Sequence, residues 1–299
     1  MDAAGGGQQL MASELLAIFI LCVTIFLFLI VIGSELFTIM ADEQLRLLRL
    51  IVHYAPLPAT CWTPAGPEPV SRYLSWALGQ NCDPACGCVR VRHEGRIRFG
   101  KDGRWMSMGG EAFFPLAVPA FVWRSTILYA PGMWLEAFDY YVDRTAAMNL
   151  NLFSVFPLNN GQPVALKERS LFRYLACTPL FPLVHATSSF IRWENIDETM
   201  AKAVISDNGQ SAEAFVRFDG RGRIGSIEAC GKTDPDTSRP VPGHFLSRYS
   251  SYTEMGGFWI PLRIVSEFIL PEGGHICAEY TITAVEPETP GISSQGVSS

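Results

Sequence analysis

Charged side chains are scarce in this sequence, and basic residues do not outnumber acidic ones. Asp, Glu, Lys and Arg account for 17% of the 299 residues, and the formal net charge is -6. A protein that holds nucleic acid through its phosphates needs a basic face, so nucleic acid is not an expected partner. Hydrophobic residues make up 48% of the chain, which excludes a disordered protein and provides ample material for a core.

Cysteine is also too sparse to hold the fold together. Eight cysteines in a chain of this length do not form a disulfide scaffold. Cys82, Cys86 and Cys88 lie close together in NCDPACGC, and His93 follows them. Structural zinc sites usually combine two closely spaced cysteine pairs, or one such pair with two histidines, and this segment has neither. It predicts a turn with free thiols or a local disulfide, and we expect no metal.

Motifs for cofactors are incomplete. Gly220, Gly222 and Gly225 spell GxGxxG in DGRGRIG. A dinucleotide site needs a strand before these glycines and a helix after them, whereas SIEA continues a strand-like alternation. The glycines therefore predict a hairpin turn, and no cofactor is expected.

One long hydrophobic run lies near the N-terminus. Residues 15–33, LLAIFILCVTIFLFLIVIG, carry no charge, and nineteen residues at about 1.5 Å each can cross a hydrocarbon core of roughly 30 Å. We predict a tail over residues 1–13 and a single transmembrane helix over residues 14–34. A signal peptide is less favoured, because no Lys or Arg precedes the run and no cleavage motif of small residues closely follows it.

The next segment predicts a connection between membrane and domain over residues 35–66. Residues 35–54 have a helical pattern with one apolar face, which fits a helix that lies on the membrane surface or prolongs the anchor. The residues after it are rich in proline and fit a semi-rigid spacer. Arg46 and Arg49 give this flank a weak basic bias, which leans toward a cytoplasmic domain but leaves the side of the membrane undecided.

Strand-like alternation fills most of the chain after residue 88. About eleven antiparallel strands are predicted, five before a helix at 165–177 and six after it. A short helix at 70–78 precedes them as a lid or plug. The expected fold is mainly β (α+β), a strongly curved antiparallel sheet or half barrel over residues 67–286 that the central helix covers. Residues 287–299 are expected to be a disordered tail.

Five segments of this region resemble a family of uncharacterised, mostly bacterial proteins. They are PEPVSRYLSWALG at 67–79, EGRIRFGKDGRWMSMGGEAFF at 94–114, ERSLFRYLA at 168–176, IRWENID at 191–197 and RYSSYTEMGGFWIPLRIVSEF at 248–268. The β-domain of this family is similar to the LolA and VioE folds, in which a curved half barrel holds lipid or aromatic molecules. The resemblance implies an apolar ligand, and the likeness to VioE implies that such a fold can also carry an enzyme without a cofactor.

The central helix and the loop after it carry the candidate reactive groups. Glu168, Arg173 and Tyr174 lie on the helix, and His185 lies in an apolar loop at the expected mouth of the half barrel. If these side chains point under the sheet, Glu168, Tyr174 and His185 are candidate acids or bases, and Arg173 would stabilise negative charge. The alternatives are an ion pair and a hydrogen bond that dock the helix on the strands, and a histidine without a role.

Tryptophans offer the broad apolar walls that lipid, isoprenoid or fused-ring ligands use, although ordinary sheet core explains them equally well. The candidate ligand-binding residues, all expected on strands, are Trp105, Trp123, Trp134, Trp193 and Trp259. The sequence predicts a single-pass, membrane-anchored protein that binds an apolar small molecule or lipid, and it leaves open whether there is a protein partner. The alternatives are a cofactor-independent cyclase or isomerase acting on an apolar intermediate, and a structural membrane subunit.

Overall fold

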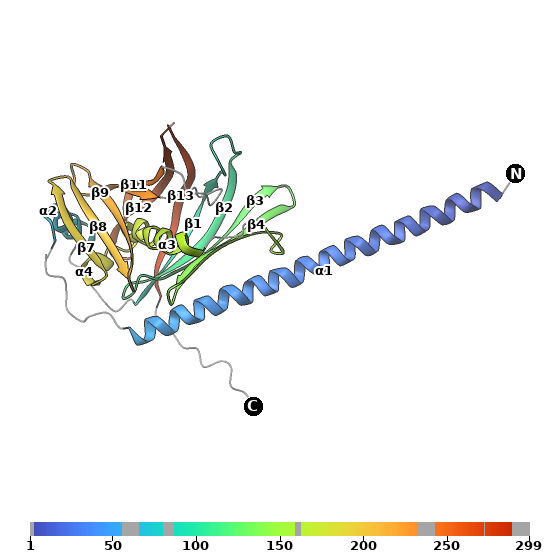
Figure 1. Ribbon diagram of the computed structural model, residues 1–299, viewed down its shortest axis with the longest axis horizontal. Coiled ribbons are helices and arrows are strands. Elements are labelled where there is room, and N and C mark those ends of the chain that lie inside the picture. Colours follow the sequence, from blue (N-terminus) through green and yellow to red (C-terminus); the bar gives the residue numbers. More distant parts are fainter. Residues whose placement is uncertain are drawn as a thin grey trace, which may run out of the picture.

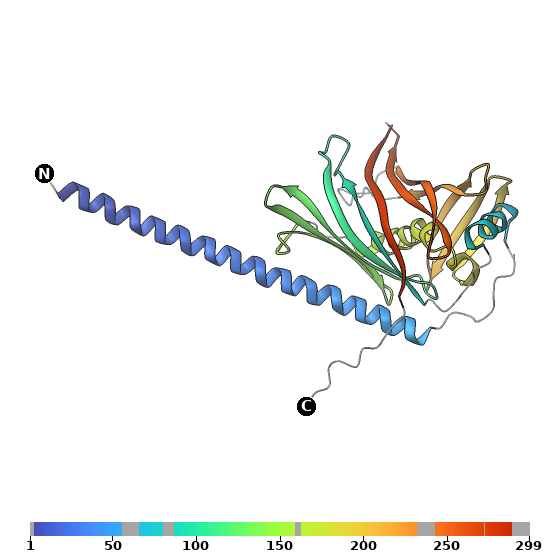
Figure 2. The same ribbon diagram turned by 180° about the vertical axis from the view of Figure 1, so that it is seen from behind.

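The computed structural model describes residues 3–55, 66–79, 87–158, 163–231, 243–271 and 273–288. These ranges form a broad β-sheet with one long helix on its outer side and shorter helices on its inner side (Figure 1, Figure 2). The helices are α1 (Ala3–Tyr54), α2 (Glu68–Leu78), α3 (Pro163–Cys177) and α4 (Val184–Thr187), with a 3-10 turn at Thr178–Leu180.

Thirteen strands form a single antiparallel sheet within the described residues. Its order is β6-β5-β4-β3-β2-β1-β13-β12-β11-β10-β9-β8-β7, so two meanders meet where β1 pairs with β13. The strands are β1 (Cys88–Ile97), β2 (Met106–Pro115), β3 (Phe121–Ala130), β4 (Met133–Val142), β5 (Thr145–Leu152), β6 (Phe156–Pro157), β7 (Ile191–Asp197), β8 (Met200–Asp207), β9 (Gln210–Phe218), β10 (Ile224–Gly231), β11 (Gly243–Met255), β12 (Phe258–Leu270) and β13 (Gly273–Glu288).

The mainly antiparallel β fold is confirmed, and its details differ from the expectation in two ways. In the described ranges six strands precede α3 and seven follow it, where about eleven in all were predicted. The sheet is open, with β6 and β7 as its edges, and the strong curvature of a half barrel is not part of this structure. A physical reason for the open sheet is that closure would need the edge strands β6 and β7 to pair, and β6 has only two residues. α3 lies on the inner side, where it contacts β4 and β5 of one meander and β8, β9 and β10 of the other.

The inner face of the sheet carries the main core. Along β1, Val89, Val91 and His93 are buried on this face, while the alternate residues Arg90 and Arg92 lie on the outer face. α3 packs against the inner face, and α2 covers it near β8 and β12. Both helices were predicted at these positions, 165–177 and 70–78, because their apolar residues recur at helical spacing.

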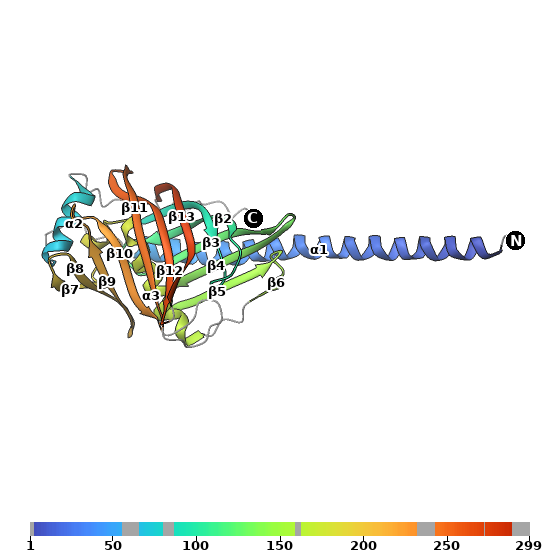
Figure 3. The ribbon, with the colours of Figure 1, turned by 90° about the horizontal axis from the view of Figure 1, so that it is seen from above.

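α1 is a continuous helix with no break where the juxtamembrane segment was expected to begin. The stretch from Met11 is long and apolar enough to cross a membrane, as a retained anchor or a signal sequence would be. Figure 3 shows the N-terminal part of α1 extending well beyond the sheet. The helix therefore prolongs the hydrophobic run, as one of the two alternatives for residues 35–54 predicted.

The C-terminal half of α1 docks on the outer face of β2, β3 and β4. Phe37 and Leu48 are buried there against Phe113 and Val122 of the sheet. The apolar face of this half of α1 is therefore covered by protein, because the outer face of these strands is apolar where the helix crosses it. Residues 56–65, most of the predicted spacer, and the predicted tail beyond Glu288 lie outside the described residues.

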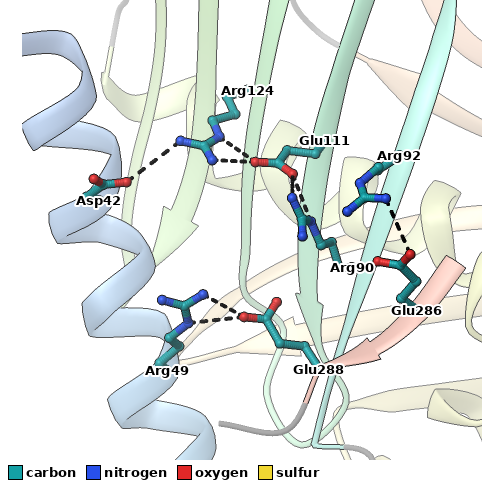
Figure 4. A network of polar contacts seen from close by, with 8 residues as sticks. All are labelled: Asp42, Arg49, Arg90, Arg92, Glu111, Arg124, Glu286 and Glu288. Atoms are coloured by element: carbon teal, nitrogen blue, oxygen red, sulfur yellow. Dashed lines mark hydrogen bonds and ion pairs between the residues drawn. The ribbon is translucent and has the colours of Figure 1, made fainter. Parts of the chain in front are cut away.

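Ion pairs surround this helix–sheet contact (Figure 4). They join α1 to β3 and to the end of β13, and they link β1, β2 and β3 to one another. The pairs are Asp42–Arg124 at 3.7 Å, Arg49–Glu288 at 2.6 Å and Arg92–Glu286 at 3.3 Å, with Glu111 bonded to both Arg90 and Arg124. Because exposed ion pairs contribute little each, the apolar contact supplies most of the docking energy and the pairs orient the helix.

Candidate functional site

A cavity of about 230 Å³ lies on the inner face, between the sheet and α3. Strands β1 to β5 and β11 to β13 contribute its walls, and one side of α3 covers it. Most of the lining is apolar, and it includes Phe99, Met108, Ile127, Leu150, Phe172 and Ile264. Small-molecule sites are concave and mostly apolar in this way, so the cavity is the main candidate for a binding site.

One ion pair lies in the wall of this cavity. The guanidinium of Arg173 on α3 donates to the carboxylate of Asp139 on β4, and their side chains are 28% and 12% exposed. The guanidinium also lies over the ring of Trp123, 4.5 Å from its centroid. Burial is the largest single influence and would lower the pKa of Arg173, but Asp139, Tyr280 and Cys177 together raise it above its usual value, so Arg173 stays charged. This contact matches the predicted alternative in which an ion pair docks the helix on the strands.

A buried histidine and a serine form a small polar cluster beside Trp123. His93 on β1 is 2% exposed, and its Nε2 lies 3.3 Å from the Ser125 Oγ. The indole N–H of Trp123 donates to the same oxygen at 3.0 Å. The ring of His93 packs against Trp123 and Tyr280, with centroids 4.9 and 5.5 Å away. Burial, and then the charge of Arg173, lower the pKa of His93 to about 4, so its ring is neutral at pH 7.

Two other titratable groups at the cavity are also held in their neutral forms. Burial raises the pKa of the Cys177 thiol to about 12, which leaves it a poor nucleophile. Burial likewise raises the pKa of the Tyr280 phenol to about 12. Among the described residues the cavity thus presents mostly apolar walls, neutral hydrogen-bonding groups, the Arg173–Asp139 pair and two further arginines, Arg98 and Arg169, which suits binding more than covalent chemistry.

The residues predicted as catalytic do not meet in one place. Arg173 lines the cavity, whereas Tyr174, the next residue of α3, turns away and donates a 2.5 Å hydrogen bond to the Pro115 carbonyl oxygen. Glu168, one and a half turns earlier, is exposed to solvent. The hydrogen bond of Tyr174 docks the helix on the end of β2, as the structural alternative predicted.

His185 lies on α4, apart from the cavity. Its ring packs against Tyr73 of α2 and Trp193 of β7, with centroids 6.3 and 5.3 Å away. Neither ring nitrogen has a hydrogen-bond partner in the part of the chain that the structure describes, and burial lowers the pKa of His185 to about 3. The acid or base roles of Glu168, Tyr174 and His185 stay predictions, and the geometry gives these groups no shared space with Arg173.

The five tryptophans predicted to bind ligand are distributed over the molecule. Trp123 lines the cavity. Trp134 packs on Phe153, away from the other tryptophans. Trp193 packs on His185 and Trp259 on Trp76, and Tyr73 links these two contacts into one aromatic cluster outside the cavity. Trp105 was predicted on a strand, which is wrong, because it lies just before β2 and beneath the guanidinium groups of Arg96 and Arg98.

Sequence reasoning missed His93, Ser125, Asp139 and Tyr280 as members of the site. The alternation of β1 carried a signal for His93, because it occupies the inward position that follows Val91 in VRVRH. A histidine in a register of buried residues indicates a polar contact inside the core. The pairing of Asp139 with Arg173 had no local signal, since 34 residues separate them.

Two other segments singled out in the sequence lie elsewhere. Cys82 and Cys86 are outside the described residues, and Cys88 begins β1 with its side chain buried. Within the residues that the structure describes, no group of three His, Cys, Asp or Glu side chains is placed to hold a metal ion. Gly220 and Gly222 lie in the turn between β9 and β10, and a strand rather than a helix follows them.

A second hollow of about 380 Å³ lies on the outer side, between α1 and strands β1 to β4. Ser34 and Thr38 of α1 face Glu111, Arg124 and Glu136 of the sheet across it. Its charges have both signs and are largely paired with one another. This hollow therefore belongs to the docking of α1 and is a poor candidate for an apolar ligand.

Several solved structures resemble this chain at low sequence identity. A LolA superfamily protein from Nitrosomonas europaea is 12% identical, with a TM-score of 0.35 over 74% of this chain and 92% of that chain. An outer-membrane lipoprotein-sorting domain from Vibrio parahaemolyticus is 9% identical, with a TM-score of 0.36 over 70% and 88%. A DUF1329 family protein from Desulfovibrio piger is 8% identical, with a TM-score of 0.33 over 70% and 88%. Such likenesses concern the fold and say nothing about what this chain binds.

At the level of sequence, the family is clear. No curated protein matches the chain significantly. A family whose description states no function matches residues 66–286, which is more than half of the chain and includes the five segments that carried the resemblance. The predicted family relationship is confirmed, and the chain belongs to the family of unknown function DUF6920.

Proposed function

We propose that this chain is a membrane-anchored protein that binds an apolar small molecule in the cavity between the sheet and α3. The observation that carries this proposal is a mostly apolar cavity whose wall holds the Arg173–Asp139 pair and two further arginines, Arg98 and Arg169. Its volume of about 230 Å³ is just below the range of roughly 300–1,000 Å³ that is usual for small-molecule sites. A small isoprenoid or aromatic compound, or one end of a lipid chain, fits that size.

Arg173 gives the cavity a means of recognising a polar end on an otherwise apolar ligand. Its side chain is 28% exposed, and the guanidinium group has five N–H donors, of which Asp139 engages only part. Trp123 supports the guanidinium from one side, so the group is held in a fixed orientation. The apolar walls supply binding energy, and Arg173 orients the ligand by donating hydrogen bonds to its carbonyl, hydroxyl or anionic oxygen.

We also infer that α1 is retained as the membrane anchor. Phe26, which is inside the hydrophobic run, packs on Phe153 of the turn between β5 and β6, with ring centroids 5.7 Å apart. Loss of the run by cleavage would remove this contact. Intact-mass measurement of the chain purified from membranes checks the inference, and a mature N-terminus after Gly33 would overturn it.

The binding proposal is tested by filling the cavity. Ala137 on β4 is half-buried and lines the cavity, so Ala137→Phe places a ring in the ligand's space. Ala147→Phe on the adjacent β5 is the matched control, because Ala147 is similarly half-buried but does not line the cavity. The full-length chain is purified in amphipol and titrated with cis-parinaric acid, a fluorescent fatty acid.

We expect wild-type and Ala147→Phe chains to bind the probe alike and Ala137→Phe to bind it at least about tenfold more weakly, because a filled cavity cannot bury the ligand. Native mass spectrometry of the same samples should show co-purifying apolar molecules lost only in Ala137→Phe. Thermal midpoints confirm that all three chains are folded. If wild type binds no probe, or if both variants bind as wild type does, the cavity is not a ligand site.

A further inference from the structure

Large apolar side chains are exposed at one end of the sheet, where β3 meets β4 and where β5 meets β6. Leu128 is 60% exposed, Phe156 43% and Leu158 54%, and Tyr129 beside Leu128 is 42% exposed. We call this surface, together with Phe153, the apolar end. Figure 1 and Figure 3 show that it points in the same direction as the N-terminal part of α1.

The apolar end is in direct contact with the hydrophobic run of α1. The Phe153 ring meets the Phe26 ring edge to face, with centroids 5.7 Å apart. Gly33 makes a second close approach, because a Cβ added there would lie only 2.3 Å from the Val155 Cγ2 atom. Glycine at this position lets the helix lie tightly against the β5–β6 turn, so the two move as one unit.

This contact fixes the depth of the apolar end relative to the membrane. Phe26 lies seven residues before Gly33, which is about 10 Å along the helix axis at 1.5 Å per residue. The nineteen uncharged residues 15–33 span roughly 28 Å and match a hydrocarbon core of roughly 30 Å, so they cannot move far out of it. A helix tilt of about 20° changes the depth by less than 1 Å. Phe153 is therefore below the level at which α1 leaves the hydrocarbon.

Basic and amphipathic side chains flank the apolar end, as they do in proteins seated at a bilayer surface. The loop between β1 and β2 carries Arg98, Lys101 and Arg104. The guanidinium of Arg104 lies 4.1 Å from the ring centroid of Tyr129, and that of Arg98 lies 4.9 Å from the ring of Trp105. Tyr, Trp, Lys and Arg are the residues that prefer the lipid headgroup region.

We propose that the apolar end is immersed in the leaflet that α1 enters, and that the ligand reaches the cavity from that leaflet without crossing water. The route is built from Phe99, which is 38% exposed on the β1–β2 loop and also lines the cavity. Ile127, the neighbour of Leu128 on β3, lines the cavity from the same end. The second part of this proposal rests on the proposed binding function, and the first part rests only on a retained anchor.

Photo-crosslinking in vesicles tests the immersion. The photoreactive residue p-benzoylphenylalanine replaces Leu128 or Phe156 in the full-length chain, which is reconstituted in vesicles of phosphatidylcholine and phosphatidylglycerol with a tritiated phosphatidylcholine. The matched controls place it at Ile196 on β7 or Phe215 on β9, which are 44% and 39% exposed and lie on strands far from the apolar end. We expect lipid adducts at Leu128 and Phe156 at about ten times the control yield or more, because only these sites are in lipid.

A second measurement tests access to the cavity. Leu128→Asp combined with Phe156→Asp should slow loading of cis-parinaric acid from the same vesicles by about tenfold, because charged side chains resist immersion. The affinity of that variant in amphipol should stay that of wild type, and Phe215→Asp should change neither value.

In the crosslinking experiment, lipid adducts at Leu128 and Phe156 that are no more frequent than at Ile196 and Phe215 would overturn the immersion, and so would adducts to a second protein chain in their place. If the probe binds wild type in amphipol but loads the aspartate variant at the wild-type rate, the access route fails while the proposed function stands.

Discussion

Replacing His93 with glutamine tests whether the wall behind the cavity depends on a neutral imidazole. His93 is 2% exposed, and its pKa is lowered from 6.5 to about 4, first by burial and then by Arg173. The folded state therefore resists a proton that the unfolded state accepts. The contribution of His93 to the free energy of unfolding is therefore fully present above pH 6.5. It declines as the pH falls from 6.5 to about 4, and it does not change further at lower pH.

The size of the effect follows from the two pKa values. Each pH unit between 6.5 and about 4 costs about 1.4 kcal/mol, so wild type at pH 5 has lost about 2 kcal/mol through His93 alone. In His93→Gln the amide oxygen replaces Nε2 as the partner of the Ser125 hydroxyl and cannot titrate. The changed packing against Trp123 and Tyr280 should cost about 1 kcal/mol at every pH.

The assay is urea unfolding of the full-length chain in amphipol at pH 7.5 and pH 5.0. We expect the free energy of unfolding to fall by about 2 kcal/mol more in wild type than in His93→Gln between these values, since all other titrating groups are common to both. His53→Gln, at an exposed position in the last turn of α1, should behave as wild type. Equal losses in wild type and His93→Gln would show that the folded protein protonates His93 freely, and the buried polar cluster would then be wrongly described.

Three further changes have defined outcomes. Leu48→Ala, at a fully buried position of α1, should lower the free energy of unfolding by about 2–5 kcal/mol and speed trypsin cleavage of α1. An unchanged thermal midpoint would contradict the docking of the helix. Glu111→Gln should lower the free energy of unfolding by about 1–3 kcal/mol at pH 7, because Arg90 and Arg124 lose their shared carboxylate. Urea unfolding at successively lower pH should show this loss shrinking only below the usual carboxyl pKa of 4.5, because the pKa of Glu111 is lowered, and a loss that begins to shrink above pH 4.5 would contradict this. His185→Leu should leave stability at pH 7.5 unchanged or higher, because neither ring nitrogen has a hydrogen-bond partner among the described residues. A loss of several kcal/mol by urea unfolding would show that they have partners.

The helices and the strand type were predictable because they depend on local spacing. The apolar residues of α2 and α3 recur at helical intervals, and the structure places these helices at Glu68–Leu78 and Pro163–Cys177, close to the predicted 70–78 and 165–177. The curvature was not predictable in the same way. It depends on long-range contacts, such as those of α3 with strands of both meanders, which involve residues far apart in the sequence.

The partner of an amphipathic face is likewise a non-local property. Residues 35–54 show one apolar face, and the same pattern suits a membrane surface or a protein surface equally. The structure pairs Arg49 of this segment with Glu288, which is 239 residues away. The spacing of apolar residues within 35–54 could not indicate whether this face meets a membrane or the sheet.

The candidate site shows the same limit on a smaller scale. Arg173 and Tyr174 are adjacent on α3, and one helical residue turns the side chain by about 100°, so one lines the cavity while the other bonds the Pro115 carbonyl. Their joint assignment to one site assumed a shared direction that the helix does not allow. His93 was weighed only as a conceivable metal ligand, although its place in the alternation of β1 put it in the core.

The anchor and the cavity occupy opposite faces of the same strands. On β3, Val122 packs under α1 and Arg124 bonds Glu111, while the alternate residues Trp123 and Ser125 line the cavity. Because successive side chains of a strand point to opposite faces, no flexible element separates the helix from the site. With α1 as the proposed anchor, the docking of α1 on β2, β3 and β4, and not the proline-rich segment that follows the helix, would set the position of the cavity relative to the membrane. A change that loosens α1 from these strands should consequently weaken ligand binding, while the hydrophobic run of α1 keeps the chain anchored.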